Sequence, residues 1–477
     1  MKRRALMLAP LAITGCSLGP VFTRPEQTDP EIWRAGNQPA VWPGETWWRG
    51  FRSPELDGLI EAAIANNLDI AAAVARIREA DAQVRQSGSA LLPAVSLQGR
   101  EAWARSGVQS RTTGRFSGRF AESRTATLQP SVSFEVDLWG RIEAMRDAAI
   151  ANALSSRFDK QTVALSVVSS VASAWFQALA LQDRLAVSAR NIGDAEQILA
   201  AIRARAAVGT ASQLDVAQQE TLVAGLRVSP PGLRSQLEQQ LNALALLTGR
   251  PPAAMEVRPG TLGALALPEV APGLPSELLA RRPDVASAEA QLMAANANIR
   301  AARANFFPTL DLTGSFGWQS LALGTLFGPG SFFANAAATG IQTVFDNGLR
   351  RAQLEQVRAR QDELLANYRK AVLQAFVDVE NGVQAYRFAT EQEALERAAV
   401  ATAQRAADIA RAQLLTGTVD VVTALQAQNA LFNNLDALAQ IRLSRFQALL
   451  GLYKALGGGW SRADMVLPAF GLFQGVL

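Results

Sequence analysis

The chain has 477 residues, with no histidine and a single cysteine, Cys16, and only 18% of its residues are charged. These counts exclude catalysis by histidine, zinc sites built on histidine or on several cysteines, and an intramolecular disulfide. The formal net charge is +4, but Lys2, Arg3 and Arg4 lie in a segment that we expect to be removed. Without them, 43 basic residues stand against 42 acidic ones, so the composition does not indicate a nucleic-acid partner.

The N-terminus has the features of a secretory signal followed by a lipid attachment site. Ala5–Ile13 form an apolar stretch that is too short to span a bilayer. Ile13-Thr14-Gly15-Cys16 resembles a bacterial lipobox, in which the cysteine becomes acylated; the alternative is an ordinary signal with an incidental cysteine. We therefore expect a covalent lipid on Cys16, and no other cofactor and no metal. Several acyl chains would anchor the terminus stably, because each buried CH₂ contributes about 0.8 kcal/mol.

The rest of the chain contains two copies of one unit. Residues 81–99 align without a gap on residues 296–314, at an offset of 215. Farther along the chain the offset becomes 208, and Gly209 then falls on Gly417. Two offsets that hold over such a distance indicate an internal duplication.

Each copy predicts a helical stretch, a strand, a loop, a second strand and a long helix. The strands at 131–138 and 310–319 alternate apolar and polar residues, which is the pattern of a sheet with one apolar and one polar face. The strand at 336–345 alternates poorly. The remaining predicted segments are helices at 54–88 and 275–305, a strand near 95–103, an arginine-rich loop at 105–124 and an uncharged loop at 321–334.

The long helices are predicted at 141–208 and 349–416, because no proline interrupts either stretch. At 1.5 Å per residue each could reach about 100 Å, a length that favours coiled-coil packing. The alternative is several shorter helices, with breaks at Gly193 or Gly382. The helices that return from them are expected to end near Leu247 and Leu456, the first of them broken midway by a pair of prolines.

Outside the signal, no apolar run approaches 18 residues, so a membrane crossing would have to use the strands. Four strands cannot close a barrel, and an open sheet edge in lipid leaves backbone groups unpaired at several kcal/mol each. A homotrimer would supply twelve strands and a polar lumen. The alternative is a soluble four-stranded sheet that packs on helices.

Together these features resemble the TolC-like outer membrane efflux family, in its lipoprotein branch that serves resistance-nodulation-division pumps. The matching segments are Leu56-Asp-Gly-Leu-Ile60, Asp137-Leu-Trp-Gly-Arg141, Arg281-Arg-Pro-Asp-Val285, Phe306-Phe-Pro308, Phe345-Asp-Asn-Gly348 and Leu452-Tyr-Lys-Ala-Leu-Gly-Gly-Gly-Trp460. The resemblance implies a mainly α fold with a transmembrane β-barrel: a trimeric twelve-stranded barrel continued by a periplasmic α-barrel of long helical hairpins. It also implies a location in the bacterial outer membrane, in contact with its lipid, and a passive conduit for drugs or other small molecules. The partners would be a periplasmic membrane-fusion adaptor and an inner-membrane pump.

The resemblance also places functional residues at the two turns where the long helices reverse. The expected adaptor-binding positions are Gly209, Thr210, Ser212, Leu214, Gly417, Thr418 and Val419. The candidate periplasmic gate residues are Asp215, Arg405, Arg411 and Asp420. The alternative is that Asp215 and Asp420 serve only as favourable charges at helix starts.

These observations divide the chain into six predicted segments. They are a signal peptide at 1–15, a lipidated segment at 16–53, a first repeat at 54–250, a linker at 251–274, a second repeat at 275–456 and a tail at 457–477. Two other functions stay open, a type I protein-secretion channel and a lipid-anchored coiled-coil scaffold. We do not expect an enzyme, because no motif pairs carboxylates or activates a nucleophile.

Overall fold

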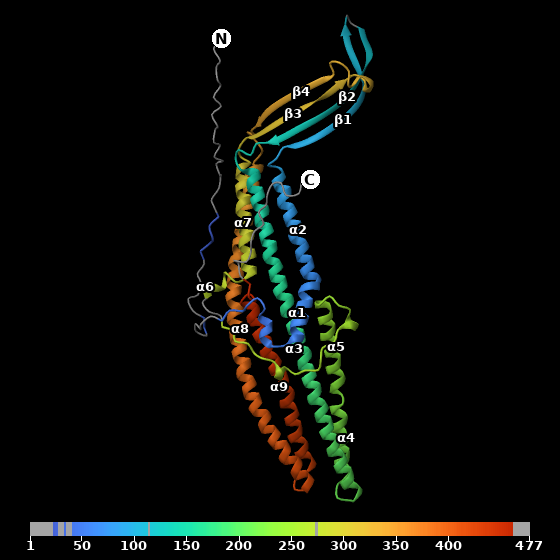
Figure 1. Ribbon diagram of the computed structural model, residues 1–477, viewed down its shortest axis with the longest axis vertical. Coiled ribbons are helices and arrows are strands. Elements are labelled where there is room, and N and C mark those ends of the chain that lie inside the picture. Colours follow the sequence, from blue (N-terminus) through green and yellow to red (C-terminus); the bar gives the residue numbers. More distant parts are fainter. Residues whose placement is uncertain (1–21, 27–32, 35–40, 113–114, 272–274, 461–477) are drawn as a thin grey trace.

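The computed structural model describes residues 22–26, 33–34, 41–112, 115–271 and 275–460. The protein is long and narrow, with a tilted sheet at one end, two helical hairpins at the other and short helices around the middle (Figure 1). It is mainly α, as predicted. The elements are η1 Trp47–Phe51, α1 Pro54–Asn66, α2 Leu68–Ser89, β1 Ala94–Thr112, β2 Arg115–Glu135, α3 Arg141–Ala207, α4 Gln213–Leu226, α5 Ser229–Leu247, η2 Pro252–Ala254, η3 Leu262–Ala264, α6 Pro275–Leu278, α7 Pro283–Ala304, β3 Thr309–Ser320, η4 Leu323–Thr325, β4 Phe332–Ile341, α8 Leu349–Thr416 and α9 Val421–Ala455.

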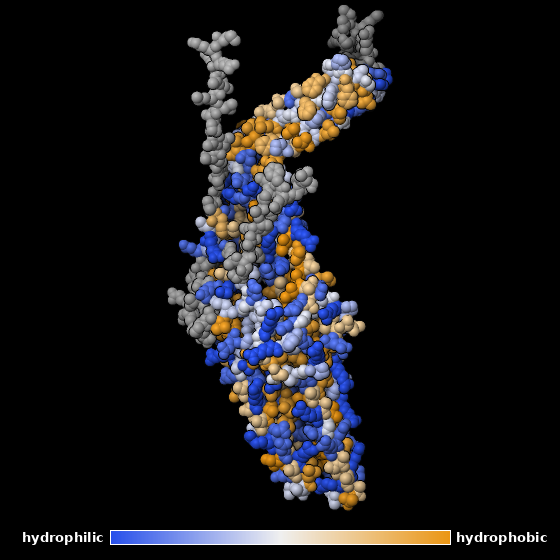
Figure 2. Space-filling model, viewed as in Figure 1, coloured by the Kyte–Doolittle hydropathy of each residue, from blue (hydrophilic) through white to orange (hydrophobic). Residues whose placement is uncertain are grey.

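The four strands form one antiparallel sheet in the order β1-β2-β3-β4. Strands β1 and β4 are its edges, and neither edge pairs with another strand of the described chain. One face carries exposed apolar side chains such as Val95, Leu97 and Leu312. The other face carries hydroxyls and amides. Figure 2 shows apolar residues over much of the end of the molecule that the sheet forms.

The arginine-rich segment at 105–124 is not a loop, and that prediction is wrong. The β1–β2 ladder runs from Ala94 paired with Ser133 to Thr112 paired with Arg115. Apolar alternation fades along this stretch although the backbone pairing continues, so the period-two signal ended before the strands did. The strand predicted at 336–345 exists but lies at Phe332–Ile341.

The long helices α3 and α8 are each unbroken, with 67 and 68 residues, so the predicted breaks at Gly193 and Gly382 are absent. The returning helix of the first copy is broken, as predicted, between α4 and α5. The helical stretches predicted at 54–88 and 275–305 are each split in two. In the first, Asn67 caps α2 by accepting hydrogen bonds from the backbone N–H groups of Asp69 and Ile70.

The main hydrophobic core lies at mid-height, where η1, α1 and α5 pack against α3 and α9. Aromatic rings dominate it: Trp47 stacks on Tyr453 at 4.7 Å, and Phe51 meets Phe176 at 5.0 Å between ring centroids. This core joins the two copies and fixes the level at which the helices above and below it meet.

Two helical stretches are long and apolar enough to cross a membrane by composition alone, Pro54–Ser89 and Arg141–Ala207. These two windows contradict the expectation that no apolar stretch outside the signal approaches this length. The apolar window of α3 is 61% buried within the protein, and the first stretch is interrupted at Asn67. Burial accounts for the window in α3, whereas the first stretch, whose window is 33% buried, is divided at Asn67 into two shorter helices. The strands stay the elements suited to lipid.

Candidate functional site

The two predicted adaptor-binding turns lie together at the end of the molecule farthest from the sheet (Figure 1). Gly209 and Gly417 take left-handed conformations, with φ of 75° and 78°, which glycine adopts without strain. A small cluster that includes Ile202, Leu414 and Val421 packs the two turns against each other. Leu214 is 65% exposed, so the joined tips present an apolar side chain to the surroundings.

Polar contacts fix the shape of each turn. The hydroxyl of Thr210 donates to the carbonyl of Arg205, and that of Thr418 donates to the carbonyl of Gln413. Ser212 begins α4 with a capping box, in which its hydroxyl accepts from Asp215 N–H and the Asp215 carboxylate accepts from Ser212 N–H. The turns are therefore rigid projections rather than loose loops.

Within the protomer, the four candidate gate residues are not brought together. Asp215 and Asp420 cap α4 and α9, and hydrogen bonding to Thr423 lowers the pKa of Asp420. Arg411 reaches from α8 to α3, where it lies 3.5 Å from the Asp194 carboxylate and 2.6 Å from Gln197 Oε1. Arg405 is exposed and donates to Thr402 one turn before it.

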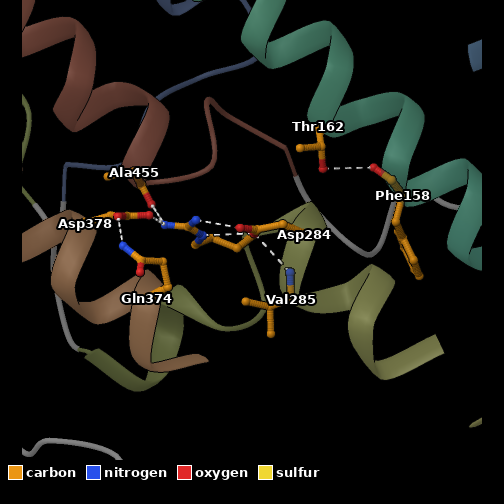
Figure 3. A network of polar contacts seen from close by, with 8 residues as sticks. Phe158, Thr162, Asp284, Val285, Gln374, Asp378 and Ala455 are labelled. Atoms are coloured by element: carbon orange, nitrogen blue, oxygen red, sulfur yellow. Dashed lines mark hydrogen bonds and ion pairs between the residues drawn. The ribbon is translucent and has the colours of Figure 1, made fainter. Parts of the chain in front are cut away.

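A polar joint at mid-height centres on Arg282, within the Arg281–Val285 motif. Figure 3 labels its partners Asp284, Asp378 and Ala455. The guanidinium, 9% exposed, makes a two-pronged ion pair with Asp284 at 2.6 and 3.0 Å and contacts Asp378 of α8 at 2.9 Å. It also donates to the carbonyl of Ala455 at the end of α9. Burial alone would raise the pKa of Asp284, but its contacts with Arg282 outweigh this effect and lower it.

The first copy has an equivalent joint that carries no charge. At the offset of 215, Arg282 corresponds to Asn67, and at the offset of 208, Ala455 corresponds to Leu247. The Asn67 amide donates to the carbonyl of Leu247 at 2.9 Å, as Arg282 does to that of Ala455. In both copies a residue at the start of an upper helix therefore holds the end of a lower helix. The sequence marked this arginine as part of a family motif but gave no sign of its role.

A second charged cluster ties α8 to α9 in the lower half. The Glu393 side chain, 3% exposed, accepts from Arg397, Arg442 and Arg445. Burial alone would raise its pKa, but these three arginines lower it to about 2. The cluster was missed by sequence reasoning because Arg442 and Arg445 lie 49 and 52 residues from Glu393 along the chain.

The polar face of the sheet is arranged in rows that cross all four strands. One row contains Ser96, Ser131, Ser315 and Asn335, in which Ser96 and Ser131 hydroxyls lie 2.8 Å apart and Ser315 donates to the Asn335 amide oxygen. Where the sheet joins α3, Arg141 makes a two-pronged contact with Glu135 at 2.6 and 3.1 Å. Along Ala94–Gly99 of β1 and its partners, this face is suited to water and the opposite face, with Val95 and Leu97, to lipid.

Other predicted features fall partly outside the described residues. Cys16, the expected lipidation site, lies outside them. Among the described residues, no group of three or more cysteine, aspartate or glutamate side chains could hold a metal ion.

Comparison with known proteins gives one family. The family model for the outer membrane efflux protein matches residues 59–250 and 274–458. The pyoverdine export outer membrane protein OpmQ of Pseudomonas aeruginosa is 38% identical and covers 96% of this chain and 97% of its own length. The toluene efflux pump outer membrane protein TtgC of Pseudomonas putida is 34% identical, with 96% of each chain covered.

Solved structures agree with these matches. A membrane protein from Pseudomonas aeruginosa superposes with a TM-score of 0.85 at 31% identity, covering 93% of this chain and 98% of the other. CusC superposes with a TM-score of 0.83 at 28% identity, covering 93% of this chain and 100% of the other. With its described tips, helical columns and two-faced sheet, the chain belongs to the outer membrane efflux protein family and is an efflux channel protein of the outer membrane.

Proposed function

We propose that three copies of this chain close a twelve-stranded barrel and a helical tunnel, through which small molecules leave the periplasm. The observation that carries the proposal is the four-stranded sheet, with one apolar face, one polar face and two unpaired edges. In lipid, each unpaired backbone group costs several kcal/mol, and pairing β4 of one copy with β1 of the next removes both edges.

A stripe on α8 supports the same assembly in the helical part. Phe388, Leu395 and Ile409 are 56%, 67% and 58% exposed and follow one another at multiples of seven residues. At 100° per residue they lie on the side of α8 opposite the buried Glu393, which faces α9. Among the described residues, no element packs on that side of α8, so an apolar heptad stripe there fits a neighbouring copy.

The export function rests on the family and on the polar inner face. Relatives are named for export of pyoverdine, toluene, antibiotics and cations, all small solutes. We infer a small-molecule cargo and a place in a pump with an inner-membrane transporter and a periplasmic adaptor, and no enzymatic activity. The exposed Leu214 and the rigid turns at Gly209 and Gly417 support the tips as the adaptor's contact.

We also propose that Cys16 carries the covalent lipid that anchors the N-terminus to the outer membrane. Phe22 lies six residues after Cys16 in the sequence and packs against the cluster of Leu292, Ala295 and Leu364. Replacing Cys16 by Ser should leave the protein without labelled palmitate in cells fed that fatty acid. Labelled palmitate on the serine variant would contradict the assignment.

The main test is purification from membranes, followed by single-channel recording. A trimer that resists SDS at room temperature, dissociates on heating and conducts ions in planar bilayers is the expected result. A monomer that is released from membranes after delipidation would overturn the proposal in favour of a lipid-anchored scaffold.

The gate residues can be separated from their capping role by paired substitutions. Asparagine is as good an N-cap as aspartate, so Asp420→Asn keeps the contact to Thr423 and removes only the charge, whereas Asp420→Ala removes both. If Asp420 closes the tips through charge, both variants raise the single-channel conductance. A conductance change in the alanine variant alone would assign Asp420 to capping.

A further inference from the structure

From the helices as far as Arg100, the polar face of the sheet carries very little charge, and the charges that it carries are separated along the strands. By the pairing register, the charged residues on this face from the helices as far as Arg100 are Glu135, Asp311 and Arg100, and Arg119 and Arg115 follow on the same face eight or more residues beyond Arg100. Glu135 is neutralised by its two-pronged contact with Arg141. The other charged residues of the described sheet, Glu101, Arg105, Arg111, Glu122 and Arg124, lie on the opposite face by the same register.

Asp311 and Arg100 lie at opposite ends of an uncharged stretch. Asp311 pairs with Glu135 near the helices, while Arg100 pairs with Thr127, eight residues farther along β2. Eight residues of strand span about 26 Å. The rows between them contain only neutral side chains: Ala94, Ser96, Gln98, Gln129, Ser131, Ser133, Thr313, Ser315, Gly317, Phe333, Asn335 and Ala337.

No described neighbour compensates either charge. Arg100 pairs with Thr127, which in turn pairs with Gln319. Asp311 lies between Thr339 of β4 and Glu135 of β2, and Glu135 is already neutralised by Arg141. The second hairpin adds none, because residues 312–345 contain no charged side chain. The separation exceeds the Debye length of about 10 Å at 0.1 M salt, so the two positions act independently.

We propose that Asp311 and Arg100 give the strand section of the channel an electrical polarity that discriminates between solutes by charge. This rests on the proposed function, in which the polar face lines the lumen and each residue occurs three times around it. Asp311 concentrates cationic solutes where the helical tunnel enters the barrel. Arg100 concentrates anionic solutes toward the outer end.

Introduced cysteines can report the local potential. Thr313→Cys lies two residues from Asp311, Gln98→Cys lies two residues from Arg100, and Ser96→Cys lies farther from both. Each variant, in isolated outer membranes, is treated with a positively or a negatively charged methanethiosulfonate. Because the attacking thiolate is itself negative, each reaction rate is divided by that reagent's rate with a free thiol in the same buffer before the two are compared. The unmodified chain, with Cys16 as its single cysteine, is the blank.

At 0.1 M salt, a charge about 7 Å away should make the favoured reagent react about threefold faster than the other. The cation should be favoured at position 313 and the anion at position 98, with a ratio near one at position 96. Asp311→Asn and Arg100→Gln should each abolish the preference at the neighbouring cysteine only. In 1 M salt, where the Debye length is about 3 Å, the preference should vanish without any further substitution, which keeps the test valid if a variant fails to fold.

Two other outcomes are informative in different ways. Cysteines that react with both reagents at equal rates in low salt would overturn the electrical polarity while leaving a water-filled lumen intact. Cysteines that react with neither reagent would show that the polar face is not water-lined, which overturns the proposed function and the inference together.

Discussion

Replacing Glu393 by glutamine should loosen the middle of the α8–α9 hairpin far more than its single lost charge would on the surface. Glu393 is 3% exposed and accepts from three arginines, which lower its pKa to about 2 from an ordinary 4.5. At 1.36 kcal/mol per pKa unit, this difference corresponds to about 3 kcal/mol of stabilisation at neutral pH. The neutral amide would also leave three positive charges crowded together without an anion.

Hydrogen–deuterium exchange resolved by peptide measures this effect where it occurs. In Glu393→Gln, amides in segments 386–397 and 438–449 should exchange on the order of 100-fold faster, since 1.4 kcal/mol is a factor of ten. Arg397, 58% exposed, and Arg445, 18% exposed, bind the same carboxylate and form a matched pair. Arg397→Gln should change exchange by less than about fivefold and Arg445→Gln by more.

The same cluster predicts the direction of the pH dependence. The pKa of Glu393 is lower in the folded protein than in the unfolded chain, so its contribution is fully present above about pH 4.5 and is lost as the pH falls toward 2. Thermal melts by circular dichroism should show this acid loss in the parent protein and much less of it in Glu393→Gln. Equal acid sensitivity in the two proteins, or parent-like exchange in the variant, would refute the reasoning.

Three further predictions concern the joint, the sheet and the trimer. Arg282→Leu should lower the free energy of unfolding by about 2 kcal/mol at neutral pH. Because Arg282 lowers the pKa of Asp284, this loss should shrink in acid, where Asp284 takes up a proton. A loss that is the same in acid would contradict this. Gly317→Ala should block trimer formation on SDS gels, because its new Cβ would lie 2.2 Å from a backbone oxygen of β2, whereas Gly314→Ala on the same strand meets nothing closer than 3.9 Å and should assemble normally. Leu395→Glu should dissociate the trimer in analytical ultracentrifugation while Leu395→Met preserves it, and intact trimers in both would remove α8 from the subunit interface.

Much of the architecture could be predicted because its signals are local. The long helices follow from uninterrupted helix-forming sequence, and their ends at Gly209 and Gly417 follow from the one residue that takes a left-handed turn without strain. The strand alternation at 310–319 follows from a sheet with one wet and one apolar face. The full length of β1 and β2 could not be predicted, because their backbone pairing continues beyond the part in which apolar and polar side chains alternate.

The charged clusters could not be predicted for a different reason. Glu393, Arg442 and Arg445 meet only because α8 and α9 fold back on each other, and no spacing in the chain reveals the register of that hairpin. Arg282 stood within a motif, yet its contacts with Asp378 and Ala455 depend on how α7 is seated above α9. At the tips, the sequence leaves two roles open for Asp215 and Asp420, as gate residues or as helix caps. Within one protomer they cap, and the gate stays a proposal.

The joints at Asn67 and Arg282 divide the helical columns into two kinds. Helices α3 and α8 pass the middle of the molecule as single rods, whereas α5 with α2, and α9 with α7, are pairs of rods that meet end to end there. A twist imposed at the tips is transmitted upward by the continuous rods and is interrupted at the seams of the paired ones. Any coupling between the tips and the strands therefore runs without interruption through α3 and α8, and through the other two columns only across the contacts of Asn67 and Arg282.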